Sequence, residues 1–374
     1  ASLVYRQVTR VYFERVPDAK TLIRLSQVIG VQGVEEIHRR LVELARQRGV
    51  VRGRRARVDT TVVETNVHYP TDSSLLGDGV RVLTRAIKRL EAATTGATQR
   101  MRTRLRATSR RMWEIKRAAL GKAPQVRERL QRGYRELLKV VRATMRDSAG
   151  ILQDVASGRR QAVDGKAARL VRRVCGQLEE LRPRLQRIIA QTRARVFGGD
   201  THFEGKLLSL FEPHTEAIRK GKAAKPTEFG KLVKLHEGEN QIIVDYEVFA
   251  KRPPDATLLQ PTVKRHKELL GRVPDLLAAD RGFWSAANKQ AALAAGVKKV
   301  CIPATGRGSA EQRHMQRQRW FRRGQRFRTG CEGRISVIKR RDGLARCRYR
   351  GMDGMDRWVG WGVVSNNVWV LITR

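Results

Sequence analysis

The sequence predicts an α/β protein whose mixed sheet, with flanking helices, is interrupted by a large helical insertion. Three observations predict this class: a lone β-branched strand at 58–63, a long stretch without strand patterns from about 80 to 196, and alternating strands and helices after Phe229. The expected organisation is an N-terminal helical region at 1–50, the first strand of the sheet domain at 51–75, a basic helical insertion at 76–227 and the rest of the sheet domain at 228–374.

Residues 1 to about 50 carry two apolar faces at helical spacing, one within 22–29 and one within 34–44. The segment Gly30-Val31-Gln32-Gly33 between them predicts a turn. The pair is either a helix-turn-helix that enters a DNA groove or a helical hairpin that packs on the sheet domain. Three acids in the second helix would repel phosphates and favour packing; they are Glu35, Glu36 and Glu43.

The strand Val58-Asp59-Thr60-Thr61-Val62-Val63 holds one carboxylate in an otherwise uncharged run. Burying that charge is costly unless a cation or a metal ion meets it. The alternative to a metal ligand is an ion pair between Asp59 and Arg57.

The predicted insertion is strongly basic: residues 80–196 contain 31 Lys or Arg and 9 Asp or Glu. Two or three long helices with arginine-rich outer faces would bind phosphates. Such residues can also form a solvated helix surface, but this excess of one sign would leave strong self-repulsion, which favours contact with DNA.

The remaining elements follow in a regular order. Two strands at 230–235 and 241–248 form a hairpin around Glu237-Gly238-Glu239-Asn240. After it we expect a helix at 253–270, a strand at 275–280, a helix at 285–295, a strand at 297–302, a helix around Glu332 and a closing apolar helix at 358–372. This order fits a ribonuclease H-like sheet, in which the carboxyl ends of parallel strands share one edge.

Two further acids occupy distinctive positions. Asp280 closes the apolar strand Asp275-Leu276-Leu277-Ala278-Ala279-Asp280, and Glu332 is the only acid between Gln312 and Arg341. Asp280 could instead pair with Arg281. Together with Asp59, these acids suit two divalent ions about 3.5–4 Å apart that cut or transfer a phosphodiester. Mg²⁺ prefers such carboxylates, and Mn²⁺ is expected to substitute.

The formal net charge of +42 and a sequence pI near 11.4 point to a polyanionic partner, most simply nucleic acid. Ribosomal and histone-like proteins are as basic but usually shorter. A membrane is a weaker candidate, because no apolar run reaches the roughly 18 residues of a spanning helix. Four cysteines show no zinc-like spacing and predict reduced thiols in the cytoplasm. Six of the seven histidines form no cluster at metal spacing and are expected on the surface or in loops: His68, His202, His214, His236, His266 and His314.

The chain resembles a DDE transposase of a bacterial insertion sequence over most of its length. The resemblance rests on the segment 58–66 with His68-Tyr69-Pro70, on Pro17 to Leu22, and on Ala279-Asp280-Arg281-Gly282-Phe283. Around the third acid, Arg328, Glu332 and Lys339 keep the spacing R-x3-E-x6-K. The family signature begins with a Tyr three residues before the Arg, where this chain has Gln325.

This resemblance implies a ribonuclease H-like catalytic domain in which Asp59, Asp280 and Glu332 bind Mg²⁺. Such enzymes nick double-stranded DNA at the ends of an element and join the 3′-hydroxyl to target DNA, as a dimer that holds two ends. The protein would be cytoplasmic and nucleoid-associated. The expected DNA contacts are Arg328, Lys339, Arg281 and Arg334. Two alternatives remain open: a ribonuclease H-like nuclease or resolvase, and a non-catalytic DNA-binding remnant of a decayed element.

Overall fold

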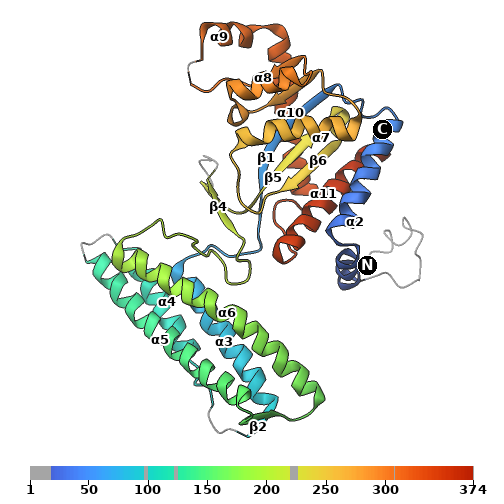
Figure 1. The fold of residues 1–374 in the computed structure, drawn as a ribbon. Helices are drawn as coiled ribbons and strands as arrows, with labels where there is room; N and C mark the ends of the chain where they lie inside the picture. The colour runs from blue at the N-terminus through green and yellow to red at the C-terminus, as the bar shows by residue number, and fades with distance from the viewer. Residues whose placement is uncertain (1–17, 97–99, 122–124, 220–225, 307, 374) are drawn as a thin grey trace. The chain divides into compact units, whose positions relative to one another are not determined.

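The computed structural model describes residues 18–96, 100–121, 125–219, 226–306 and 308–373. Residues 1–17, which include the start of the predicted N-terminal helical region and Pro17, lie outside the described part. The chain divides into two compact units (Figure 1). The sheet unit contains the residues up to Asn66 and those from Glu216 onward, and the helical unit spans Val67–Thr215.

The described residues of the sheet unit form a six-stranded sheet, which is mixed, as predicted; its strand β4 was not expected. Its central strand β1 pairs antiparallel with β5 and parallel with β7, which in turn pairs parallel with β8. Strands β4 and β6 pair antiparallel with different parts of β5. The strands are β1 (Arg55–Glu64), β4 (Glu216–Arg219), β5 (Thr227–Glu237), β6 (Ile243–Val248), β7 (Leu276–Ala279) and β8 (Lys299–Cys301).

Helices cover both faces of this sheet (Figure 1). Side chains alternate along a strand, so each face of β1 meets a different set of helices. Val58 packs against Val263 and Phe283 on one face, whereas Val63 packs with Ile338 and Val359 on the other. The first face is covered by α7 (Leu259–Leu270) and α8 (Ala286–Ala294), and the second by α10 (Arg319–Arg341) and α11 (Gly351–Ile372). Shorter elements are η1 (Glu239–Gln241), η2 (Asp255–Leu258), η3 (Arg281–Phe283) and α9 (Ala310–Arg317).

The first described helix, α2 (Ala19–Gln47), is interrupted at Gly30, whose φ of 71° lies outside the helical region. The predicted turn between two helical segments is therefore present. The second segment packs on α11 and α7, and His38 Nε2 lies 2.9 Å from the Ile243 carbonyl oxygen. These contacts agree with a helical pair that packs on the sheet domain, rather than with a helix-turn-helix that is free to enter a DNA groove.

The contact between α2 and α11 predicts a pH-dependent stability. Burial and the charges of Asp353 and Glu35 raise the pKa of Asp356 to about 6. The folded chain therefore binds the Asp356 proton more tightly than the unfolded chain does. The stability gained from this proton is complete below about pH 4 and is lost as the pH rises through 6. We expect Asp356→Asn to stabilise the chain against urea by about 1–2 kcal/mol at pH 7, with little effect at pH 4. Asp353→Asn, on the same helix but exposed, should have a smaller effect, and an equal gain at both pH values would contradict the assignment.

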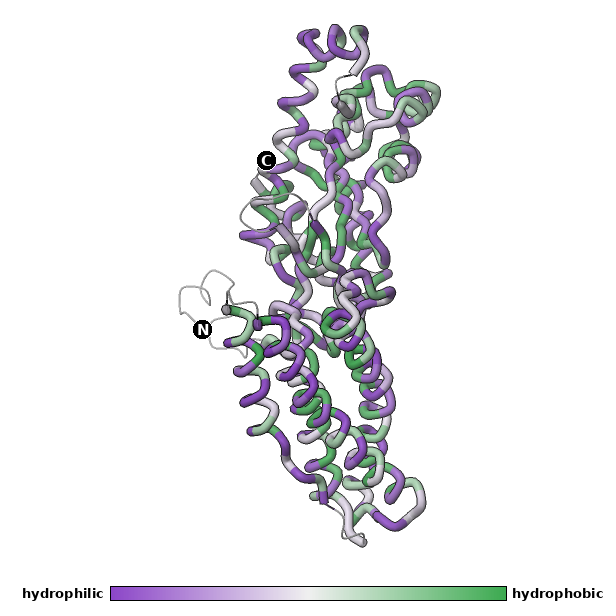
Figure 2. Tube along the Cα trace, turned by 90° about the vertical axis from the view of Figure 1, so that its left-hand side faces the viewer, coloured by the Kyte–Doolittle hydropathy of each residue, from purple (hydrophilic) through white to green (hydrophobic). Residues whose placement is uncertain are grey.

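In its described residues, the helical unit is a bundle of four helices rather than the two or three predicted. They are α3 (Asp72–Ala92), α4 (Leu105–Ala119), α5 (Val126–Ala156) and α6 (Gly165–Gly198), with a small antiparallel sheet of β2 (Thr94–Gly96) and β3 (Arg160–Ala162). Leu76, Leu83, Leu137 and Leu185 are among the fully buried side chains of its core. Hydrophobic and hydrophilic residues alternate along these helices (Figure 2), as expected where one face of a helix is buried in a core.

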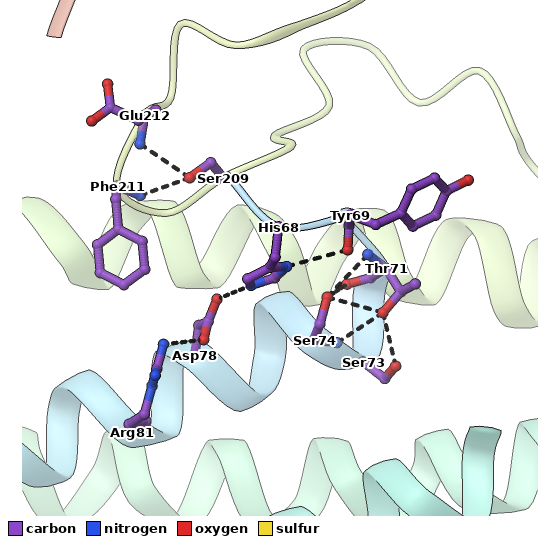
Figure 3. A network of polar contacts seen from close by, with 10 residues as sticks. All are labelled: His68, Tyr69, Thr71, Ser73, Ser74, Asp78, Arg81, Ser209, Phe211 and Glu212. Atoms are coloured by element: carbon purple, nitrogen blue, oxygen red, sulfur yellow. Dashed lines mark hydrogen bonds and ion pairs between the residues drawn. The ribbon is translucent and has the colours of Figure 1, made fainter. Parts of the chain in front are cut away.

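Helix α3 begins at a capping box. The Thr71 hydroxyl accepts a bond from the Ser74 amide at 3.1 Å, and the Ser74 hydroxyl accepts one from the Thr71 amide at 3.0 Å (Figure 3). The preceding loop folds back on the helix, because His68 Nε2 lies 2.7 Å from a carboxylate oxygen of Asp78, which also pairs with Arg81. The segment His68-Tyr69-Pro70 therefore belongs to the helical unit and not to the sheet. Among the described residues, no helix is both long enough and apolar enough to cross a bilayer.

Candidate active site

Asp59 lies in β1, and Asp280 directly follows β7, the parallel neighbour of β1. The β1–β7 ladder ends with the pair Val58 and Ala279, and each acid is the next residue along the chain. Neighbouring strands lie about 4.8 Å apart, so the backbones of the two acids run side by side. The fold thus brings together two acids that are 221 positions apart in the chain.

Helix α10 crosses the sheet beside Asp59. Asp59 shares a face of β1 with Arg57, whose guanidinium donates to the Phe327 carbonyl of α10 and lies 4.7 Å from the Phe327 ring centre. Burial, followed by the charges of Glu237 and Asp59, raises the pKa of the Cys331 thiol well above its ordinary value. Cys331 is therefore close to Asp59 and stays protonated at neutral pH.

A buried ion pair lies where α10 packs on β1. The Arg57 guanidinium donates two bonds to the Glu237 carboxylate, one of them at 2.9 Å. Glu237 is only 1% exposed, and burial raises its pKa despite Arg57. The pair joins β1, β5 and α10 next to the candidate site.

Glu332 is exposed and pairs with an arginine of its own helix. It follows Cys331 on α10, but its side chain is 57% exposed and its carboxylate pairs with Arg328 at 2.9 Å. Over the described ranges, no group of three His, Cys, Asp or Glu side chains is arranged to hold a metal ion. The structure therefore places two of the three predicted ligands next to each other and the third on an adjacent helix, with its charge already neutralised.

A fourth acid, which the sequence did not single out, lies at this edge. The Thr60 hydroxyl donates to Asp255 Oδ1 at 3.3 Å. A Cβ built on Gly282 would lie 3.0 Å from Asp255 Oδ2 and 3.1 Å from Asp280 Oδ1, so the two carboxylates flank the same small space. In the sequence, Asp255 only follows Pro253-Pro254 at the start of a predicted helix, and nothing in its spacing points to Asp280.

The predicted DNA contacts lie in different environments. Arg328, Glu332 and Lys339 share one side of α10, because residues separated by 4 and 11 positions fall on one helix face. Arg281 is exposed in η3, directly after Asp280. Arg334 is 9% exposed and donates to Asn366 and Gln241, and burial lowers its pKa, so this side chain links α10 to α11 and η1.

Gln325 occupies the position of the signature tyrosine and faces the sheet. Its amide donates to the Cys301 carbonyl at 3.0 Å. The side chain is thus used to attach α10 to β8.

The prediction that the histidines lie on the surface or in loops is wrong for two of them. His236 and His266 are fully buried, with His236 Nε2 3.0 Å from His266 Nδ1 and His266 Nε2 3.0 Å from the Gly53 carbonyl oxygen. Burial lowers the pKa of both rings, so they are neutral at pH 7. The sequence could not show this, because the partners come from β5 and α7. All four cysteines are free thiols, as predicted.

Comparison of the chain with protein-family models, with curated proteins and with solved structures gave no match.

Proposed function

We propose that the chain is a DNA transposase that cuts DNA at the ends of a mobile element and joins the freed 3′-hydroxyl to target DNA. The observation that carries this proposal is the position of Asp59 in β1 beside Asp280, which directly follows the parallel strand β7, next to a helix that bears Glu332, Arg328 and Lys339. Ligand sites form at the carboxyl ends of parallel strands, and acids placed there can hold the divalent ions that promote phosphodiester chemistry.

The sheet supports a ribonuclease H-like catalytic domain. Its strand order β6-β5-β1-β7-β8 begins with three antiparallel strands and ends with two that are parallel to β1. The helical unit enters this domain between β1 and β4, as an insertion should.

The charge distribution supports DNA as the partner. Along α5, five exposed cations recur at intervals of three or four residues and form one stripe on the outside of the bundle: Arg132, Arg135, Lys139, Arg142 and Arg146. Such a stripe follows a phosphate backbone without reading sequence. Because two element ends must be held together, we expect a homodimer on DNA, in the cytoplasm and associated with the nucleoid.

The carboxylate oxygens at this edge suit Mg²⁺ or Mn²⁺. Asp59 and Asp280 would hold the ion, and Glu332 would join them only after leaving Arg328. When bound, a divalent ion activates the attacking oxygen and stabilises the leaving one.

The chain's own residues would position the DNA strand. Arg328 is held by Glu332, so an arriving phosphate would compete for the guanidinium and release the carboxylate. Lys339, on the same side of α10, and Arg281, beside Asp280, would contact neighbouring phosphates. DNA binding would in this way complete the acidic group that is incomplete in the free chain.

The test is an assay of cleavage and joining on a labelled duplex that carries the element's own end. We expect both activities with Mg²⁺ or Mn²⁺, and joining only from a 3′-hydroxyl end. Cleavage without joining would identify a nuclease or resolvase instead. DNA binding without either reaction would overturn the enzymatic proposal.

One observation favours a second candidate, a non-catalytic DNA-binding protein. The ion pair between Glu332 and Arg328 leaves two acids together rather than three. If the chain only binds DNA, Asp59→Asn and Glu332→Gln would leave its affinity for DNA unchanged, and neither the variants nor the wild type would cut or join DNA.

A further inference from the structure

A second charged site lies on the opposite edge of the sheet from the acids. A cavity of about 740 Å³ opens at the amino ends of β1, β7 and β8, within the size range of pockets that bind small ligands. Because these strands are parallel, their amino ends lie away from Asp59 and Asp280, which follow the last paired residues of β1 and β7. The cavity is therefore separate from the candidate active site.

Six exposed cations line this cavity: Arg54, Arg55, Lys298, Lys299, Arg319 and Arg323. The one acid in its lining, Asp275, is already paired with Arg272 at 2.9 Å and Lys298 at 3.1 Å. Helix α10, 23 residues long, begins at Arg319 and adds the positive end of its dipole. Like charges gathered in this way repel one another, and a bound polyanion would relieve that repulsion.

One wall of the cavity is aromatic. Trp320 is partly exposed there. Its ring makes an edge-on contact with the buried ring of Phe321, with the ring centres 5.5 Å apart. The Lys299 ammonium lies 5.8 Å from the centre of the indole ring. An indole among cations offers a stacking surface for a base whose phosphates meet the positive charges.

We propose that this cavity binds an unpaired DNA strand, with its phosphates on the arginines and lysines and one base against Trp320. Duplex DNA fits less well, because its bases are stacked on each other and present no free face to the indole. The site would hold a strand at a distance from the acids, whether or not the chain cuts DNA.

The test must report on this cavity alone, since a chain of charge +42 binds DNA at other places too. The full chain carrying Asp59→Ala is labelled with 5-fluorotryptophan and titrated, without metal, with 5′-phosphorylated tetrathymidylate. Fluorine NMR resolves the six tryptophans, and Trp320→Phe identifies the Trp320 signal by its loss. We expect that signal to shift and saturate. A Trp320 signal that does not move while the oligonucleotide binds would overturn the proposal.

A matched pair of variants tests the charges. Arg319→Ser with Arg323→Ser should weaken the titration at Trp320 on the order of tenfold and reduce its logarithmic salt slope by about 1.4. Arg322→Ser with Arg326→Ser removes the same charge from exposed positions of the same helix outside the cavity lining and should change neither. Unchanged signals from the other five tryptophans show that the variants fold, and equal weakening by both pairs would refute the site. A failed cleavage assay would not affect this result, because the binding experiment involves no reaction.

Discussion

Replacing Asp59 with Asn is expected to lower the rate of DNA cleavage and joining at least about a thousandfold, with DNA affinity within about twofold of the wild type. The substitution keeps the shape of the side chain but removes the charge that would hold a divalent ion. Such an ion contributes several kcal/mol to the transition state, and each 1.36 kcal/mol corresponds to about a factor of ten in rate. Affinity should persist, since phosphates are bound by the cations of the chain rather than by its acids.

Asp280→Asn should have the same effect, because Asp280 follows the residue paired with Val58. Asp353→Asn, an isosteric change at an exposed position on α11, is the matched control and should leave the rate unchanged. Rates would be measured on one labelled element end at saturating enzyme and Mg²⁺. Loss of activity only in parallel with loss of DNA binding would show that the acids support the structure rather than the reaction.

Removal of Arg57 is expected to cause a large loss of stability. Arg57→Met would leave the carboxylate of Glu237, which is 1% exposed, without its ionic partner. Breaking a buried pair in this way typically costs about 3–5 kcal/mol of unfolding free energy. It also removes the bond from Arg57 to the Phe327 carbonyl, which attaches α10 to β1.

The double variant Arg57→Met with Glu237→Leu should lose less than Arg57→Met alone, because both charges are then absent from the interior. Urea unfolding of the singles and the double would give the coupling energy. The surface pair of Arg39 and Glu36, at 2.8 Å, provides the control, and Arg39→Met should cost far less stability than Arg57→Met, because solvent screens this exposed pair. A loss for Arg57→Met as small as for Arg39→Met would mean that Glu237 is protonated in the folded chain.

The sequence predicted the elements well where a local pattern determines them. The apolar runs of β1 and β7 and the turn around Gly238 placed strands that the structure contains at nearly the same positions. The number of bundle helices was underestimated because α4 and α5 are both basic and amphipathic, so the residue pattern does not separate them.

The candidate site was less predictable, since it depends on contacts between distant segments. Asp255 approaches Asp280 through the placement of η2 beside η3, and no local pattern encodes that approach. The direction of Glu332 follows its ion pair with Arg328, whereas the like charges of the aspartates would repel its carboxylate. The sequence contains all these residues, but it does not show which contacts between them have the lowest free energy in the folded chain.

The strand pairing at Gly230 has a consequence for how such a chain could have arisen. Gly230 on β5 is flanked by Glu64 of β1, just before the chain leaves the sheet, and by Glu216 of β4, where it returns. The two points are about 10 Å apart, the width of two strand spacings. A few residues would close that gap, so an ancestral sheet could have acquired the whole bundle at a surface turn without rearranging its core.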